Sequence, residues 1–389
     1  MVTEFSGATA IAGAANTAFS FVSERSHLDL ALEAITLALD DAGLATHDVD
    51  GITGYSFDRV REYELVNNLG LDDLAFFAES PYGNGCGAVA LAALAVASGR
   101  ASTVVAFRSV KAPLGDTLHF DQDMESIAPA LAGSRVHHAP FGLLTVIQWA
   151  ALVAQRYVHR YQCDPDGFGW VTVVEREYAA TNPAALHFGR PLSWADYLAS
   201  PVAASPLRLP DGNVGNDGAS AVVVTTAERA ADMRHAVIPI LAAGWATGPE
   251  LEVVTSYQRA DIEWPEETAI LARRLYAEAG IGPADVDFLE VYDHISALAV
   301  LSLEGLGFCG PGEAVDFVRG GTTIRVDGRL PLNTHGGHLG EAYVQTMNHV
   351  VEAVRQLRGE AVNQVAGASI GLVVGGSLAP VTGLVLGTS

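Results

Sequence analysis

The chain has 389 residues, of which 49% are hydrophobic and 17% are charged, and its formal net charge is −23. This length and composition predict two or more compact domains with large buried cores, and the acidic balance excludes nucleic acid as a ligand. No apolar run reaches the roughly 18 residues that a membrane span requires. The first residues lack the pattern of a secretory signal.

The three cysteines, Cys86, Cys163 and Cys309, are scattered along the chain. An odd and dispersed set of cysteines is typical of a reducing compartment, and it excludes a disulfide framework and a CxxC metal site. The sequence therefore predicts a cytoplasmic protein.

The first elements in chain order are a strand over residues 8–14 and a helix that starts after Ser26 and ends at Gly43. The segment that follows, DAGLATHDVDGI at 41–52, is repeated as EAGIGPADVDFL at 278–289, an offset of 237 residues. A helix is expected before both copies. The repeat predicts that one helix–turn–strand unit occurs twice.

A second echo compares Gly99-Arg100-Ala101 with Gly359-Glu360-Ala361, each of which ends a helix and leads into an apolar strand. Two similar α/β halves explain both echoes, and chance similarity of two short units is the alternative. We predict an N-terminal half over 1–235 and a C-terminal half over 236–389.

The helix after Gly87 consists almost entirely of Ala, Val and Leu, and a helix that is apolar all round is expected in the centre of a molecule. The region of about 110–215 is too long for a simple connection. It contains expected helices around 143–161 and 168–180. We interpret this region as a lid or a substrate-facing insertion within the first half.

The stretch 331–359 contains a glycine-rich loop with His335, His338 and Glu341, followed by a helix expected to begin with Tyr343. Unpaired N–H groups at such a helix start suit a developing anion. The alternative is an ordinary turn whose histidines face solvent. Although the histidines have HxxH spacing, no cysteine or carboxylate cluster joins them in sequence, so we predict no metal.

Four segments resemble the thiolase superfamily, and most closely its thiolase-like lipid-transfer proteins: AIAGAANTAFS at 10–20, residues 182–230, NTHGGHLGEAY at 333–343, and GGSLAP at 375–380. The resemblance covers nearly the whole chain. It implies an α/β thiolase-like fold, in which duplicated α/β/α halves form a five-layered αβαβα sandwich.

The catalytic positions of the superfamily are occupied by other residues in this chain. The nucleophilic cysteine corresponds to Tyr82, whereas Cys86 lies inside the helix as a small buried filler. The second cysteine falls within 371–376, which contains none. The Asn-Glu-Ala-Phe element corresponds to 292–295, and the Gly-His-Pro element to 342–344. These replacements exclude Claisen condensation and thiolysis by a covalent cysteine.

Two classes of function remain: a non-catalytic acyl-CoA or lipid-binding scaffold, and an enzyme with different chemistry in the same pocket. The resemblance favours the aldolases of steroid side-chain degradation. These cleave a 17-hydroxy steroid with a three-carbon CoA thioester side chain to a 17-ketosteroid and propionyl-CoA. Another acyl-CoA lyase or a hydratase is the further alternative.

For the retro-aldol reaction we expect two tyrosines on opposite sides of the scissile bond. One, with a lowered pKa, takes the proton of the β-hydroxyl, and the other supports the enolate and returns a proton to carbon. Which tyrosine has which role stays open. The predicted catalytic residues are Tyr292, His294 and Tyr343, and the predicted substrate-binding residues are Tyr82, His338, Gly337 and Gly376.

The predicted partners follow from the same resemblance. We expect no cofactor other than the CoA of the substrate, a homodimer, and a small zinc-ribbon/OB-fold partner protein. The acidic balance of the chain gives that partner a physical use, because it could hold the CoA phosphates.

Overall fold

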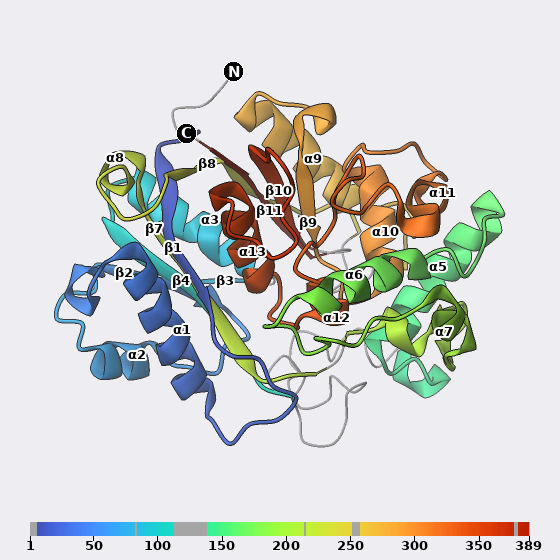
Figure 1. Cartoon of the computed structure of the whole chain (residues 1–389), viewed down its shortest axis with the longest axis horizontal. Helices are drawn as coiled ribbons and strands as arrows, with labels where there is room; N and C mark the ends of the chain where they lie inside the picture. The colour runs from blue at the N-terminus through green and yellow to red at the C-terminus, as the bar shows by residue number, and fades with distance from the viewer. Residues whose placement is uncertain are drawn as a thin grey trace.

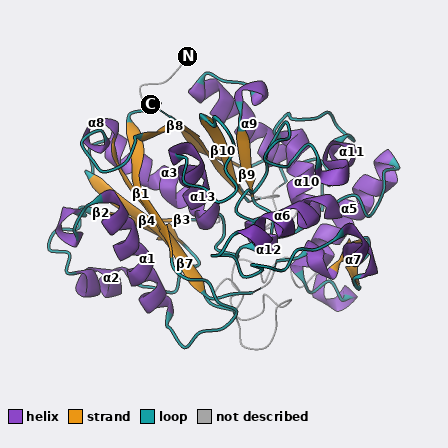
Figure 2. Cartoon of the chain, viewed as in Figure 1, coloured by secondary structure: helices purple, strands orange, loops and turns teal. Residues whose placement is uncertain are grey.

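The computed structural model describes residues 6–81, 84–112, 138–213, 215–250, 257–376 and 380–388. Nine strands form one sheet, in the order β3-β2-β4-β7-β1-β8-β11-β10-β9, and β5 and β6 form a separate pair (Figure 2). The strands are β1 (Thr9–Asn16), β2 (Gly51–Tyr55), β3 (Phe76–Ser80), β4 (Thr103–Val110), β5 (Val202–Ala204), β6 (Leu207–Arg208), β7 (Gly218–Thr226), β8 (Ile238–Ala246), β9 (Phe288–Val291), β10 (Ile370–Gly375) and β11 (Val381–Gly387).

Helices surround this sheet and also pass between its two halves (Figure 1). They are α1 (His27–Ala42), α2 (Glu62–Leu69), α3 (Asn84–Ala97), α5 (Val146–Tyr161), α6 (Gly169–Thr181), α7 (Trp194–Ala199), α8 (Ala227–Ala230), α9 (Glu266–Ala279), α10 (Ser296–Gly305), α11 (Ala314–Val318), α12 (Gly337–Gly340) and α13 (Met347–Arg358). None of the described helices is long and apolar enough to cross a membrane.

The sheet contains the same arrangement of strands twice. The run β2-β4-β7-β1 in the first half corresponds to β9-β10-β11-β8 in the second. In each run the first pair is parallel and the next two pairs are antiparallel. The two runs meet where β1 pairs antiparallel with β8. The predicted duplication is confirmed, whereas the boundary at residue 235 stays a prediction.

Local sequence explains why the duplicated units begin and end alike. Ser26 forms a capping box with Asp29 at the start of α1. Gly43 and Gly280 end α1 and α9 in the left-handed conformation, at φ 73° and 72°, which glycine adopts without steric cost. A short 3₁₀ turn then leads into β2 and into β9.

The helices divide the fold into five layers. α1 packs on the outer face of the first run of strands, and α9 packs on β8 and β11 of the second. α3 and α13 contact each other and strands of both runs, so they form the middle layer (Figure 1). The predicted αβαβα sandwich is confirmed, as is the central position of the apolar helix α3, whose Cys86 is fully buried.

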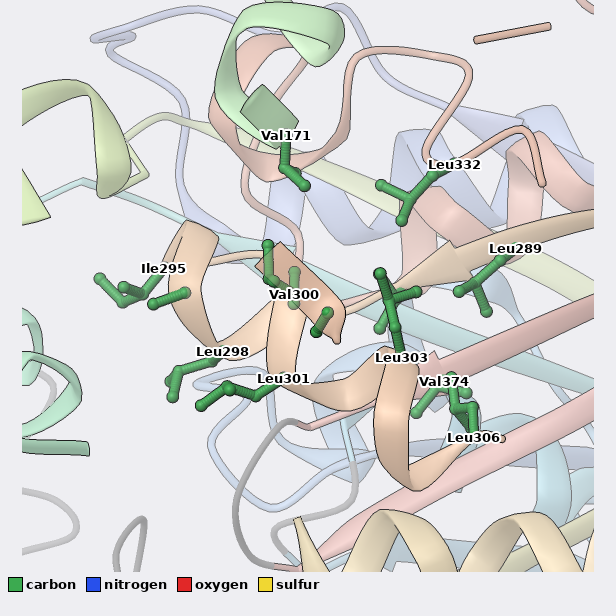
Figure 3. Packing of buried hydrophobic residues seen from close by; sticks show 14 of the residues in the cluster. Val171, Leu289, Ile295, Leu298, Val300, Leu301, Leu303, Leu306, Leu332 and Val374 are labelled. Carbon is green, nitrogen blue, oxygen red and sulfur yellow. The ribbon is translucent and has the colours of Figure 1, made fainter. Parts of the chain in front are cut away.

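The largest core cluster lies around α10 and also includes side chains of α5 and α6. Figure 3 shows Leu298, Leu301 and Leu303 of this helix among side chains from β9, β10 and α6. α10 is buried along its whole length, so the segment before it, residues 292–295, is held between a strand end and a buried helix.

The described part of the 110–215 region packs on the second half of the molecule. α5 and α6 contact α10, and α6 also contacts α12 (Figure 1). Residues 113–137 lie outside the described residues. The role of this region as a lid stays a prediction.

Candidate active site

The end of β9 brings Tyr292, Asp293 and His294 into the interior. Asn333 fixes the last strand residue, because its Oδ1 accepts the Val291 N–H at 2.8 Å and its Nδ2 donates to the Val291 carbonyl at 3.0 Å. The Tyr292 N–H donates to the Val374 carbonyl of β10 at 2.9 Å. The positions of the three side chains are therefore set by hydrogen bonds of the sheet edge.

The second segment of the site runs from Gly336 to Met347 and differs from the continuous helix that was expected. It consists of the single turn α12, a stretch with Tyr343 that is neither helix nor strand, and two left-handed residues, Gln345 (φ 48°) and Thr346 (φ 73°), before α13 begins. The expectation that the helix includes Tyr343 was wrong, because these two residues interrupt it. The apolar spacing gave no sign of the interruption.

The two predicted catalytic tyrosines are in direct contact. The phenol oxygens of Tyr292 and Tyr343 lie 2.8 Å apart, although the residues are separated by 51 positions in the sequence. Tyr292 is buried and Tyr343 half-buried. The phenols therefore form a hydrogen-bonded pair, whereas the sequence-based hypothesis placed them on opposite sides of the scissile bond.

The pKa of Tyr292 moves in the opposite direction to the one expected for a base. Burial, followed by the effect of Tyr343, raises the pKa of Tyr292 well above that of an exposed phenol. At neutral pH Tyr292 is thus a neutral phenol. The Tyr343 backbone is held by Asn216, whose Oδ1 accepts the Tyr343 N–H at 2.7 Å.

His294 lies beside the phenol pair as a neutral imidazole. Its ring centroid is 4.6 Å from that of Tyr292, and it is 5% exposed. Burial, reinforced by His338, lowers the pKa of His294 to about 3. Its Nδ1 has no hydrogen-bond partner in the described part of the chain, so this buried nitrogen is a candidate for contact with a ligand.

Asp293, which sequence reasoning did not select, connects the two segments of the site. Its Oδ2 accepts the backbone N–H groups of His338 at 2.6 Å and Leu339 at 3.2 Å. Its Oδ1 lies 2.9 Å from Nε2 of His349 and 3.0 Å from Nδ1 of His338. Burial alone raises the pKa of Asp293, but these histidine contacts outweigh it and hold that pKa well below its usual range.

The absence of a side chain at Gly337 leaves room for the Asp293 carboxylate to reach the loop that carries His338. A Cβ at Gly337 would lie 2.3 Å from Oδ2 of Asp293 and 2.7 Å from Oε2 of Glu175. Burial, followed by Asp293, raises the pKa of Glu175, which makes it a neutral acid beside an ionised one. Glu175 comes from α6 in the 110–215 region, and its position in the sequence gave no sign of this role.

Two groups of buried residues in this network have the donor atoms of a metal site. Glu290, His335 and His349 form one, and Asp293, His338 and His349 form the other, with ligand atoms within 4.8 Å of one another. The alternative that the loop histidines face solvent was wrong, because His335 and His338 are each 1% exposed. A buried carboxylate also joins His335, which sequence spacing did not indicate.

A protonated His335 would neutralise part of the negative charge of the buried carboxylates around it. Burial alone lowers the pKa of His335, but Glu341 and Glu290 outweigh it and raise that pKa to about 10. Nδ1 of His335 lies 3.1 Å from Oε2 of Glu290. An imidazolium can thus fill the place that a metal ion would take, and the prediction of no metal stays a prediction.

The remaining predicted substrate-binding residues are Gly376 and Tyr82. Gly376 has a left-handed backbone (φ 85°), and its Cβ position is 3.4 Å from Nδ2 of Asn84 at the start of α3. Tyr82 lies outside the described residues. Cys86 is buried within α3, and burial raises the pKa of its thiol, which does not suit a nucleophile.

The fold and the sequence of the second half define a thiolase-like protein. Residues 250–388 match the family model described as Thiolase C-terminal domain-like. A human mitochondrial 3-ketoacyl-CoA thiolase shares the fold over 100% of both chains, with a TM-score of 0.69 and 13% identity.

Three matches with higher sequence identity show which family within the thiolase-like proteins the chain resembles. The chain is 42% identical to the steroid side-chain-cleaving aldolase of Thermomonospora curvata, over 98% of each protein. It is also 42% identical to the 17-hydroxy-3-oxo-4-pregnene-20-carboxyl-CoA lyase of Mycobacterium tuberculosis, over 98% of this chain and 100% of that one. A solved Ltp2-ChsH2(DUF35) aldolase superposes with a TM-score of 0.92 at 41% identity, over 99% of this chain and 98% of that one. The chain belongs to this family of steroid side-chain-cleaving aldolases.

Proposed function

We propose that this protein is a carbon–carbon lyase that cleaves a 17-hydroxy steroid carrying a three-carbon CoA thioester side chain. The products are a 17-ketosteroid and propionyl-CoA. The direct contact between the phenols of Tyr292 and Tyr343 is the observation that carries the proposal. The family relationship supports the choice of substrate.

The reaction balances without any further reactant. The hydroxyl oxygen loses its proton and becomes a ketone, while the bond between the carbinol carbon and the α-carbon breaks. Its electron pair forms the enolate of the thioester, which is then protonated on carbon. One proton leaves oxygen and one arrives on carbon, so the chemistry calls for no redox cofactor and no water.

A hydrogen-bonded pair of neutral phenols suits this transfer. One phenol accepts the hydroxyl proton on its oxygen while it passes its own proton to the other, and the second phenol supplies a proton to carbon. The pair ends each cycle in its starting protonation state. A standing phenolate, which the raised pKa of Tyr292 makes costly, is thereby avoided.

The acidic chain favours a partner that binds the CoA phosphates. Its single lysine, Lys111, is held by Asp217 at 2.9 Å and by the Ser23 carbonyl at 3.1 Å. We propose that a DUF35-type protein with a zinc ribbon and an OB fold supplies positive charge for the CoA phosphates, as the related aldolase described with DUF35 suggests. We also propose a homodimer that works in the cytoplasm.

The decisive experiment is to purify the chain with and without a DUF35-type partner and to supply 17-hydroxy-3-oxo-4-pregnene-20-carboxyl-CoA. Formation of equimolar ketosteroid and propionyl-CoA is expected. A matched substrate without the 17-hydroxyl should remain intact, because it has no proton to transfer. If the hydroxylated substrate is bound but not cleaved in the complex, the chain is a binding scaffold.

A further inference from the structure

The ring of His338 is placed where a substrate donor would be expected, yet both of its nitrogens face protein groups. Nε2 accepts the backbone N–H of Thr346 at 3.1 Å. Nδ1 lies 3.0 Å from Oδ1 of Asp293. A nitrogen that accepts a hydrogen bond carries a lone pair, so this network assigns the ring proton to Nδ1. The ring is 1% exposed, so it is enclosed by protein atoms.

The group that His338 holds is the turn between Tyr343 and α13. Gln345 and Thr346 both have positive φ, at 48° and 73°, a conformation that costs roughly 1–2 kcal/mol per residue other than glycine. Such a turn persists when surrounding contacts fix it. The His338 ring supplies one contact at Thr346, and Arg108 supplies another through its hydrogen bond to Oε1 of Gln345.

The same ring also lies against both phenol rings. Its centroid is 5.0 Å from that of Tyr292 and 5.0 Å from that of Tyr343, with interplanar angles of 78° and 70°. This edge-on packing is the favourable arrangement for aromatic rings. His338 therefore packs against both members of the phenol pair, while its Nε2 accepts from Thr346 and its Nδ1 lies beside Asp293.

The negative charge of Asp293 favours a proton on Nδ1 of His338, the nitrogen left to carry it once Nε2 accepts from Thr346. Its carboxylate lies beside Nδ1 and also accepts the backbone N–H of His338 itself. Because Asp293 stands between Tyr292 and His294 in the chain, one carboxylate links the strand that carries the first phenol to the turn that positions the second.

We propose that His338 is a positioning residue: as the Nδ1–H tautomer, which the nearby Asp293 favours, it holds the Gln345–Thr346 turn and thereby keeps the Tyr343 phenol against Tyr292. This inference rests on the proposed function for the role of the two phenols. The geometric part, the tautomer and the turn, stands independently of it.

Two near-isosteric variants distinguish the roles of the two ring nitrogens of His338. Gln in His338→Gln places an amide oxygen near the position of Nε2, so the acceptor for Thr346 is kept. Asn in His338→Asn places its amide near Nδ1 and loses that acceptor. We expect His338→Asn to lower kcat about 10²-fold with little change in KM, the scale of a misplaced general acid–base group. His338→Gln should recover most of that loss.

Amide hydrogen exchange tests the positioning role without any assay of activity. The backbone amide of Thr346 should exchange faster in His338→Asn than in wild type, and stay protected in His338→Gln. A peptide from α1 serves as the internal control for global stability. Equal protection of Thr346 in all three proteins would overturn the proposal, even if the enzyme is an aldolase.

Nitrogen-15 spectra of selectively labelled histidine test the tautomer. The expected spectrum for His338 shows a protonated Nδ1 and a non-protonated Nε2, unchanged when product ketosteroid and propionyl-CoA are added to the complex. A protonated Nε2, or one that becomes protonated on binding, would make His338 a direct ligand donor and refute the proposal. If the chain is inactive but both spectra and exchange agree, the proposed function fails and the positioning role remains.

Discussion

The two central helices, α3 and α13, occupy equivalent places in the duplicated fold but differ in composition. Both lie in the middle layer and lead to equivalent strands, β4 and β10. The buried side chains of α3 beyond its first residue are apolar, whereas α13 buries four polar side chains beside its apolar ones. These are Asn348, His349, Glu352 and Gln356.

The two equivalent helices therefore have different roles in the same architecture. α3 fills the centre of the molecule, and the resemblance predicts that Tyr82, just before it in the sequence, stands at the family's nucleophile position. α13 and the loop before it carry the hydrogen-bonded network that supports the phenol pair. The proposed catalytic tyrosines both lie in the second half, and each prediction below tests this difference between the two halves.

The largest effect is expected from Tyr292→Phe and Tyr343→Phe. Each removes one phenol of the pair but keeps the ring, so kcat/KM should fall by about 10²–10⁴-fold. The free energy of unfolding should fall by only about 1 kcal/mol, for the lost hydrogen bond. Steady-state kinetics of the complex and urea unfolding measure the two effects. Near-full activity of both variants would place the chemistry elsewhere.

A large stability effect is expected from His335→Gln, and it should depend on pH. The pKa of His335 is raised from 6.5 to about 10 in the folded protein, so its protonation stabilises the fold fully below pH 6.5. This stabilisation is lost as the pH rises through 10, and it is on the order of 5 kcal/mol. Urea unfolding should show that the cost of the substitution is much smaller at pH 10 than at pH 6.

A matched control for this variant is His47→Gln, because His47 is exposed on the first half of the molecule. Its effect on unfolding should be small at both pH values. If His335→Gln costs the same at pH 6 and pH 10, His335 is not the internal cation of the buried cluster.

An intermediate effect is expected from Gly337→Ala compared with Gly99→Ala. Both glycines have positive φ, at 59° and 70°, but only Gly337 has buried oxygens within 3 Å of the Cβ position. Gly99→Ala should cost about 1 kcal/mol and Gly337→Ala about 2–4 kcal/mol of unfolding free energy. Thermal unfolding of both variants measures the difference, and equal costs would contradict the close approach of Asp293.

The smallest effect on activity is expected from Cys86→Ser in α3. The thiol is fully buried, so a hydroxyl there should lower the free energy of unfolding by about 1–2 kcal/mol. Turnover should stay within a few-fold of wild type, because this residue fills space. A thousand-fold loss of kcat would restore covalent catalysis by cysteine to consideration.

Much of the fold was predictable because its signals are local. Ser26, Gly43 and Gly280 end or begin helices through their own side chains or backbone freedom, and the repeat around them revealed the duplication. The break at Gln345 and Thr346 was not predictable. It depends on contacts with Arg108 and His338, which only the folded chain brings together.

The site was predictable where the resemblance supplied aligned positions. Tyr292, His294 and Tyr343 came from two such elements, and the structure brings them together. Asp293 lies between Tyr292 and His294 in the same element, and its acidic side chain beside two predicted catalytic residues was a signal that it could position them. Glu175 could not, because it lies more than a hundred residues away and reaches the site only through the packing of α6 on α12.

The two ends of the nine-stranded sheet have different consequences for assembly. The outer edge of β9 is occupied, because Leu289 exchanges hydrogen bonds with Pro331 and Asn333. β3, at the other end, pairs with β2 on one side, and within the described residues no strand follows it on the other. Among the described strands, β3 is therefore the place where the proposed second copy would extend the sheet. Such a contact uses the same edge of both copies and closes on itself, which permits a pair but not a growing fibre.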